Sequence, residues 1–203
     1  MASTAEIVDA FRWMHHIDKD ITLAINACNS PVTDSIWQLF SARAIWLVLY
    51  LGIAAFMIFR MGWKKGLLLI LACILCVTTN DQLANVIKES VQRLRPVFDS
   101  EMIARGLHVL EVPGQPYGFY SAHAANTAGF VICSIIGVHE DKKHKYTLYA
   151  VLMCLWSLLV GLSRIFVGKH FFGDVCAGFI IGIAIGILFG LLFRLVCAKL
   201  IRG

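Results

Sequence analysis

Five apolar segments constrain the fold of this chain more than any other feature of its sequence. They are separated by short charged stretches and lie at about residues 44–59, 66–79 with a weak continuation to 87, 124–138, 146–162 and 175–193. A helix that crosses a membrane needs roughly 20 apolar residues, with about 17 as the short limit. The first segment is slightly short, but the arginines at its two ends can snorkel to the membrane surface. The sequence therefore predicts an all-α bundle of five transmembrane helices.

The composition leaves no room for a separate soluble domain. The chain has 203 residues, of which 59% are hydrophobic, and its mean hydropathy is +0.74. Such values are typical of a chain that is largely embedded in a membrane. We expect residues 1–203 to form a single membrane-embedded domain, in which residues 44–203 make up the transmembrane bundle.

The N-terminal segment, residues 1–43, does not follow this pattern. Charged side chains interrupt its apolar positions between Asp18 and Asp34, and Pro31 breaks the segment. It has no apolar core followed by a small-residue cleavage site, which argues against a signal peptide. We expect interfacial amphipathic helices here. A sixth, weak span over residues 21–40 is the alternative.

Basic residues predict which way the bundle faces. They gather in loops on one side, at Arg60, Lys64, Lys65, Lys142, Lys143, Lys145, Arg194, Lys199 and Arg202. The positive-inside rule makes this side cytoplasmic. We therefore expect a multi-pass protein of the inner (plasma) membrane whose other end faces the periplasm or the extracytoplasmic space. The net charge of +5 is modest and no basic patch with interleaved aromatic residues is present, so nucleic acid is not an expected partner.

A concentration of polar groups follows the fourth apolar segment. Ser163 and Arg164 are followed after five residues by His170 and after three more by Asp174, which gives S-R-x5-H-x3-D. Ionisable residues at a membrane boundary are costly unless they perform chemistry. Four residues apart on a helix, His170 and Asp174 would share a face, so that the carboxylate could fix the tautomer of the imidazole. His170 is a candidate nucleophile or base.

Two further blocks precede this one. Lys88, six residues and then Arg95 and a proline give K-x6-R-P, and Y-S-A-H at residues 120–123 stands just before the third apolar segment. In this order the three blocks resemble the motifs K-x6-R-P, P-S-G-H and S-R-x5-H-x3-D of the type 2 phosphatidic acid phosphatase superfamily of integral-membrane lipid phosphatases. The first and third blocks agree at every defining position, whereas the middle block departs at Tyr120 and Ala122. The resemblance spans residues 88–174.

The resemblance implies a phosphatase that acts through a phosphohistidine. By it, His170 attacks phosphorus, Asp174 holds the other ring nitrogen of that imidazole, and His123 is the general acid that protonates the leaving group. The substrates it implies are undecaprenyl diphosphate, phosphatidylglycerophosphate, phosphatidate and the lipid A phosphates. A zinc site made of these three side chains is conceivable, but nearby cations argue against it. Neither a metal nor another cofactor is expected.

The remaining motif residues are predicted to hold the phosphate. Lys88 and Arg95 lie on one helical face, and the residue before a proline avoids helical conformation. We therefore expect the helix to end near Leu94 and Arg95 to swing inward. Arg164 can bind a phosphate with two parallel hydrogen bonds. Asp81, on the helical face of Lys88, is expected either to support that lysine or to make a purely structural contact.

The middle block is predicted to bind the phosphate through a helix N-terminus. Ser121 is the expected N-cap of the helix that continues to residue 138. Free N–H groups at such an end attract anions. The glycine that the family has at position 122 would supply an N–H with conformational freedom, whereas Ala122 keeps the N–H but disfavours positive φ.

Two other classes of function use the same residues. A non-hydrolytic protein that binds or translocates a lipid phosphate could use the cations, but it has no need of both histidines and Asp174. A haloperoxidase-like use of the site with vanadate is disfavoured in a membrane-embedded chain. The sequence therefore favours a lipid phosphatase over both.

Two further features have open roles. The connection between Pro96 and Tyr120 is long and rich in turn formers and aromatics, which suits either a lid over the site or a covering strap. The last apolar segment has glycines at every fourth position, namely Gly178, Gly182, Gly186 and Gly190. Such a bare face permits close helix packing. Packing within the bundle is favoured there over a homodimer seam.

Overall fold

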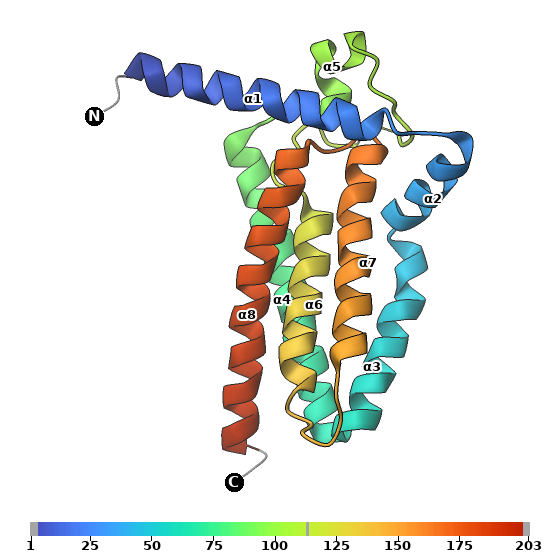
Figure 1. Cartoon of the computed structure of the whole chain (residues 1–203). Coiled ribbons are helices and arrows are strands. Elements are labelled where there is room, and N and C mark those ends of the chain that lie inside the picture. Colours follow the sequence, from blue (N-terminus) through green and yellow to red (C-terminus); the bar gives the residue numbers. More distant parts are fainter. Residues whose placement is uncertain (1–3, 113, 201–203) are drawn as a thin grey trace.

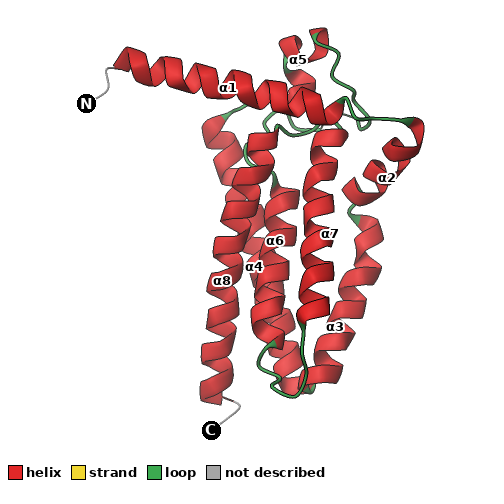
Figure 2. Ribbon diagram, in the orientation of Figure 1, coloured by secondary structure: helices red, strands yellow, loops and turns green. Residues whose placement is uncertain are grey.

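The computed structural model describes residues 4–112 and 114–200, and in this part of the chain it is all-α (Figures 1 and 2). The helices are α1 (Thr4–Asn26), α2 (Pro31–Ser41), α3 (Leu47–Met61), α4 (Trp63–Val91), α5 (Ser100–Ala104), α6 (Ala122–Val138), α7 (Thr147–Phe166) and α8 (Phe172–Leu200), with 3-10 turns at Ala44–Trp46 and Pro96–Phe98. Among the described residues, four stretches are long and apolar enough to cross a membrane, and α6 is a shorter apolar helix. The predicted polytopic all-α bundle is confirmed.

The core of the bundle is built around α6, which packs against α4, α7 and α8 (Figure 1). Its residues are mostly small and buried, so neighbouring helices can approach closely. The glycine face of α8 lies against it: a Cβ on Gly178 would be 2.6 Å from the carbonyl oxygen of Ser121, and one on Gly186 would be 2.6 Å from that of Gly129. The glycine face is therefore used inside the bundle, which is the packing that the sequence favours.

The N-terminal segment forms two helices with a sharp turn between them. In Figure 1, α1 lies across one end of the bundle and α2 leads from there towards α3. The turn ends at Ser30, whose side chain accepts a hydrogen bond from Thr33 N while Ser30 N donates to Thr33 Oγ1 at 2.8 Å, and Pro31 follows as the first helical residue. This capping box starts a new helix. A continuous span over residues 21–40 is therefore wrong.

The two ends of the bundle differ in charge. The α3–α4 turn and the α6–α7 loop lie at one end, and α1 and α5 lie at the other (Figure 1). The first end contains the basic loops around Lys64 and Lys142, while Arg202 lies outside the described residues. The end of α4, the start of α6 and the α7–α8 connection all lie at the second end. The three motif blocks are thus separated from the basic loops by the length of the bundle.

Helix α4 ends three residues before Leu94, the end that Pro96 predicts. The helix ends at Val91 because Gln92 takes a left-handed conformation with φ of 52°, and its N–H bonds back to the Lys88 carbonyl at 2.9 Å. Arg95 is extended, with φ of −72° and ψ of 156°, as expected before a proline. Its N–H donates to the Pro116 carbonyl at 2.9 Å. The end near Leu94 was wrong, but the inward turn at Arg95 is present.

Candidate active site

The residues of the three motif blocks come from separate helices and meet at the end of the bundle that α1 covers. Their positions are the last turn of α4 for Lys88, the N-cap of α6 for Ser121, the last turn of α7 for Arg164 and the first turn of α8 for Asp174. The exposed fractions are 7% for Lys88, 4% for Arg164 and 0% for Asp174. Ionisable side chains are rarely buried to this degree unless they are paired or functional. This end of the bundle is the candidate active site.

His170 lies in the turn that connects α7 with α8. Its spacing from Asp174 suggests a shared helix, but Gly168 takes a φ of +79° in this turn and α8 begins only at Phe172. The two side chains nevertheless meet, since Nδ1 of His170 is 3.5 Å from Oδ2 of Asp174. The carboxylate therefore lies near the expected ring nitrogen, but Nδ1 has no hydrogen-bond partner in the described part of the chain, and the two residues do not share a helix.

The other ring nitrogen of His170, Nε2, lies 3.1 Å from Nη1 of Arg95. Because a guanidinium can only donate, Nε2 is assigned as the acceptor and holds the lone pair. Burial, followed by the positive charge of Arg95, holds the pKa of His170 well below its ordinary value of 6.5. The imidazole is therefore neutral, and its unprotonated nitrogen points to Arg95, a cation that could bind a phosphate.

Arg93 is a site residue that the sequence did not single out. Its Nη1 donates to Oδ1 of Asp174 at 2.6 Å and its Nη2 donates to Oδ2 of Asp18 at 2.6 Å. The guanidinium also lies over the ring of Phe171, 4.1 Å from the centroid. Arg93 thus holds the carboxylate that faces His170. The only signal for it in the sequence is one more arginine between Lys88 and Arg95.

The N-terminal helix α1 supports the same region. Oδ1 of Asp18 accepts a hydrogen bond from Gly173 N at 2.7 Å, and Oγ1 of Thr22 accepts one from Phe172 N at 2.9 Å. These side chains satisfy N–H groups at the start of α8, which have no partners within their own helix. A segment that lies outside the span of the resemblance therefore fixes the first turn of α8 and with it Asp174.

Arg164 is held by residues from two other segments. Its Nη1 contacts the side chain of Ser41 and lies 3.6 Å from Oε1 of Glu111, whose other oxygen pairs with Lys169 at 2.7 Å. Burial by itself raises the pKa of Glu111, but Lys169, Ser41 and Arg164 lower it overall. Glu111 is therefore ionised and orients Arg164. The buried Nε of Arg164 has no protein acceptor in the described part of the chain.

Lys88 and Asp81 lie on the same helix but do not form an ion pair. Asp81 accepts a hydrogen bond from Asn126 Nδ2 at 3.2 Å, and among the described residues the structure gives it none from Lys88. Asp81 nevertheless interacts electrostatically with Lys88. Support of Lys88 by Asp81 through its charge stays a prediction.

Ser121 caps α6 as predicted. Its Oγ accepts a hydrogen bond from Ala124 N at 3.5 Å, and its own N–H donates to the Asp174 carbonyl at 3.0 Å. Ala122 is the first helical residue and does not have a positive φ. The conformational freedom of a glycine is therefore not needed at this position, and the departure of the middle block leaves the helix N-terminus intact.

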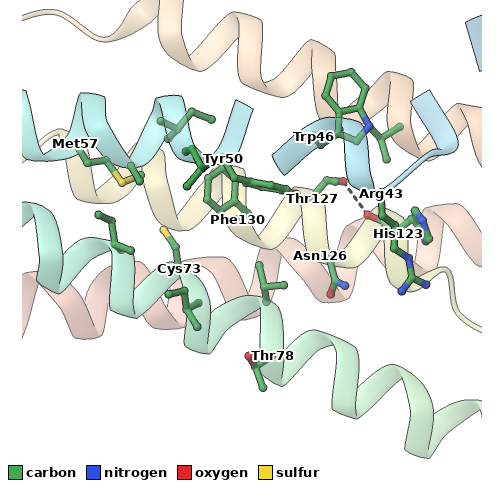
Figure 3. Close-up of a pocket in the computed structure, with 17 residues that line it drawn as sticks. Arg43, Trp46, Tyr50, Met57, Cys73, Thr78, His123, Asn126, Thr127 and Phe130 are labelled. Carbon is green, nitrogen blue, oxygen red and sulfur yellow. Dashed lines mark hydrogen bonds between the residues drawn. The ribbon is translucent and has the colours of Figure 1, made fainter. Parts of the chain in front are cut away.

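A cavity of about 460 Å³ opens beside His123 and runs between α3, α4 and α6 (Figure 3). Its walls are mostly apolar, with Met57 and Cys73 far from the histidine. The end near His123 is polar and includes Arg43 and Asn126. Ligand sites are typically apolar hollows of this size with a few polar groups at one end. The shape suits a molecule with an apolar tail and a charged head.

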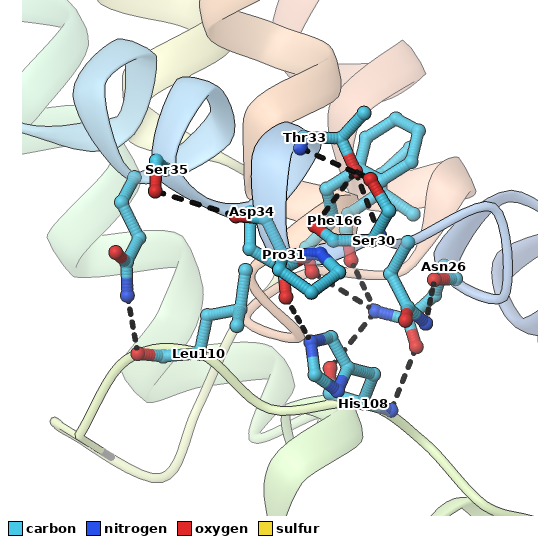
Figure 4. Close-up of polar contacts among 12 residues, drawn as sticks. Asn26, Ser30, Pro31, Thr33, Asp34, Ser35, His108, Leu110 and Phe166 are labelled. Atoms are coloured by element: carbon cyan, nitrogen blue, oxygen red, sulfur yellow. Dashed lines mark hydrogen bonds and ion pairs between the residues drawn. The ribbon is translucent and has the colours of Figure 1, made fainter.

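The connection between Pro96 and Tyr120 is tied down by polar contacts. Asn26 donates to the carbonyl oxygen of His108 at 2.9 Å and accepts from its N–H at 2.8 Å (Figure 4). Lys19 pairs with Asp99 at 2.7 Å and also with Glu101. The sequence left open whether this connection is a mobile lid or a fixed covering strap. These bonds attach it to α1 and favour the strap.

The described residues contain no group of three or more histidine, cysteine or acidic side chains that could hold a metal ion. His123, His170 and Asp174 stand instead among Lys88, Arg95 and Arg164, with which they interact electrostatically. A dication would be repelled by such neighbours, whereas a phosphate would be attracted. The donor set thus fits an anion.

The arrangement of these blocks is that of a known family. Residues 63–196 match the PAP2 superfamily. The chain belongs to this superfamily. The family predicted from the three blocks is thereby confirmed, as is the prediction that the chain is a phosphoric ester hydrolase of the membrane.

Individual PAP2 proteins resemble the chain over most of its length. It is 31% identical to the lipid A 4'-phosphatase of Bacteroides thetaiotaomicron over 84% of this chain and 74% of that protein. It is 33% identical to phosphatidylglycerophosphatase B of Bacillus subtilis over 68% of this chain and 61% of that protein. The crystal structure of a transmembrane PAP2-type phosphatidylglycerolphosphate phosphatase from Bacillus subtilis superposes with a TM-score of 0.69 at 26% identity, over 93% of this chain and 88% of that one.

The contact between Arg93 and Asp174 predicts a role for an arginine that is not a defining position of the PAP2 motifs. Arg93→Ala should lower kcat about 10- to 100-fold, the loss typical when a residue that orients a site group is removed. KM should change much less, because Arg93 faces Asp174 and α1. Arg93→Lys keeps the charge but cannot bond both carboxylates in the same way, so its kcat should lie between those of Arg93→Ala and the unaltered protein.

Steady-state kinetics on the purified variants would test this prediction. Arg105→Ala is the matched control, because Arg105 also pairs with α1, at Asp20 and 2.6 Å, but contacts none of the three blocks. It should keep the kcat of the unaltered protein. Equal losses in the two variants would mean that Arg93 serves only to attach α1.

Proposed function

We propose that this PAP2 protein removes a terminal phosphate from a membrane lipid, at the non-cytoplasmic face of the inner (plasma) membrane and through a phosphohistidine on His170. The observation that carries the proposal is the orientation of His170. Nδ1 faces Asp174 at 3.5 Å, and Nε2 lies 3.1 Å from Arg95. A neutral imidazole in this orientation presents one lone pair to a phosphate that Arg95 binds.

The reaction has two steps. In the first, Nε2 of His170 forms a bond to phosphorus and the bond from phosphorus to the leaving oxygen breaks. His123, which takes up a proton when the phosphate anion binds beside it, gives that proton to the leaving oxygen. In the second, water attacks the phosphohistidine, His123 takes a proton from the water, and free phosphate leaves with His170 restored. Lys88, Arg95, Arg164 and the N–H groups at the start of α6 stabilise the charge on the non-bridging oxygens.

The apolar cavity supports a lipid as the leaving group. It starts at His123, which is the proposed donor of the proton to the leaving oxygen, and continues between α3, α4 and α6. An acyl or polyprenyl chain can occupy it while the phosphate lies at the motif residues. Lipid A phosphate, phosphatidylglycerophosphate, phosphatidate and undecaprenyl diphosphate are the proposed substrates, the first two because relatives carry those names.

The sidedness is inferred from the loops. The lysines at the start of α4 and in the α6–α7 loop lie at the end of the bundle opposite to the site. Basic loops stay on the cytoplasmic side of a membrane. We therefore place the site on the periplasmic or extracytoplasmic side.

The proposal is tested by measuring phosphate release from these four lipids. The protein is inserted in sealed vesicles so that its basic loops face the interior. We expect release from at least one lipid, undiminished by EDTA and blocked by vanadate added outside, since vanadate mimics a five-coordinate phosphorus. Complete loss in EDTA that zinc or magnesium restores would contradict the metal-free mechanism. Tight binding of the lipids without any release would favour the binding or translocating class, and block only by vanadate sealed inside would reverse the sidedness.

A further inference from the structure

Arg43 stands at the polar end of the cavity, beside His123 (Figure 3). It precedes the short 3-10 turn that joins α2 to α3. The sequence explains it as a boundary arginine that snorkels to the membrane surface. The structure leaves Arg43 exposed and also places it on the wall of the cavity that contains His123.

The surroundings of Arg43 are cationic. It interacts electrostatically with Lys88, His123 and Arg164. The pKa of Arg95 is lowered by burial first, against the opposing charge of Asp174, and Arg43 lowers it further. Like charges placed together repel, so the arrangement favours an anion between them.

Two carboxylates of the site are already engaged by cations other than Arg43. Asp174 pairs with Arg93, and Glu111 pairs with Lys169 and lies close to Arg164. Among the described residues the structure gives the guanidinium of Arg43 no hydrogen bond and no ion pair. Its donors are therefore available to a ligand in the cavity.

Arg43 lies on the side of the site from which the product leaves. In a displacement at phosphorus the attacking and leaving atoms are roughly in line, on opposite sides of the transferred group. The proposed attacking atom belongs to His170, and the proposed proton donor is His123. Arg43 lines the same cavity as His123, whereas His170 does not line it. A cation at this place can act on the leaving group.

We propose that Arg43 is a specificity-determining residue that binds an anionic oxygen of the leaving group and so favours lipid diphosphates. The inference rests on the proposed function. When the bond from the terminal phosphorus to the bridging oxygen breaks, its electron pair stays on a lipid monophosphate. Arg43 stabilises that charge while His123 supplies the proton. A lipid monophosphate leaves as a neutral alcohol, for which Arg43 has little to bind.

The test compares a polyprenyl diphosphate with the polyprenyl monophosphate of the same chain length. Arg43→Ala should lower kcat/KM for the diphosphate about 10- to 100-fold, as expected for a lost hydrogen bond to a charged group. The loss for the monophosphate should be no more than about 3-fold, and Arg43→Lys should be intermediate. Arg60→Ala is the matched control, because Arg60 lies in the last turn of α3, does not line the cavity and packs over Phe56 at 5.7 Å. It should leave the ratio of the two values unchanged.

Binding provides a second measurement that does not depend on turnover. In a His170→Ala background, which cannot turn the lipid over, the diphosphate should raise the Tm more than the monophosphate does, and adding Arg43→Ala should remove this difference. Equal losses of kcat/KM on both lipids, or a Tm difference that survives in the variant, would overturn the inference. Failure to cleave either lipid would overturn the proposed function instead, and the Tm comparison would still decide the role of Arg43.

Discussion

Replacing His170 with alanine is expected to abolish turnover of every phosphorylated substrate. Without Nε2 no phosphoenzyme can form, whatever the leaving group. Kinetic burst experiments and mass spectrometry should detect a phosphohistidine at residue 170 in the unaltered protein and none in His170→Ala. His144→Ala is the control, because His144 lies in the α6–α7 loop, paired with Asp141 at 2.7 Å, and should leave turnover unchanged.

The pH dependence adds a second readout for His170. A protonated imidazole cannot attack, and burial with the charge of Arg95 lowers the pKa of His170 from its ordinary value of 6.5. Protonation therefore begins only at more acidic pH, so kcat/KM should hold as the pH falls through 6.5 and decline below it. A decline centred above 6.5, or residual turnover in His170→Ala with a phosphohistidine at residue 123, would contradict the assignment.

Replacing His123 with alanine should produce a loss that depends on the leaving group. Hydrolysis of an alkyl phosphate should fall by about 10²- to 10⁴-fold, as is typical when a general acid is lost. Hydrolysis of p-nitrophenyl phosphate should fall much less, because p-nitrophenolate is stable without a proton. His123 is in the first turn of α6 and lines the cavity in which we propose that the leaving group lies. Its loss should therefore slow departure of the leaving group.

The comparison of the two substrates in one variant is its own internal control. A folding defect or a loss of phosphate binding would lower both rates by the same factor. Equal losses would therefore assign His123 to binding or structure. A loss confined to the alkyl phosphate, together with full loss on both in His170→Ala, would separate the two histidines as acid and nucleophile.

Local features of the sequence predicted two conformations in the candidate site. Ser121 caps α6 because a short polar residue before an apolar helix satisfies its free N–H groups. Arg95 turns inward because the residue before a proline is extended. Both effects depend on neighbours within a few residues, so they can be recognised without the tertiary structure.

The contacts that the sequence missed join residues far apart in the chain. Arg93 bonds Asp18, 75 residues away, and Asp174, 81 residues away. Arg43 and His123 line one cavity only because α2 packs against α7 and α3 packs against α4 and α6. No spacing rule relates such positions, and Arg93 and Arg43 therefore look like ordinary boundary charges.

Hydropathy and the three motif blocks were enough to determine the membrane-embedded all-α bundle and its family. A long apolar segment in lipid can satisfy its backbone only as a helix, and buried ionisable groups must have partners or a function. Tertiary structure decided that His170 meets Asp174 across a glycine turn and not along a helix. The tertiary structure also decided that α1 fixes the start of α8 and that Arg43 lines the same cavity as His123. These depend on how whole helices pack, which is a property of all their side chains together and of no single motif.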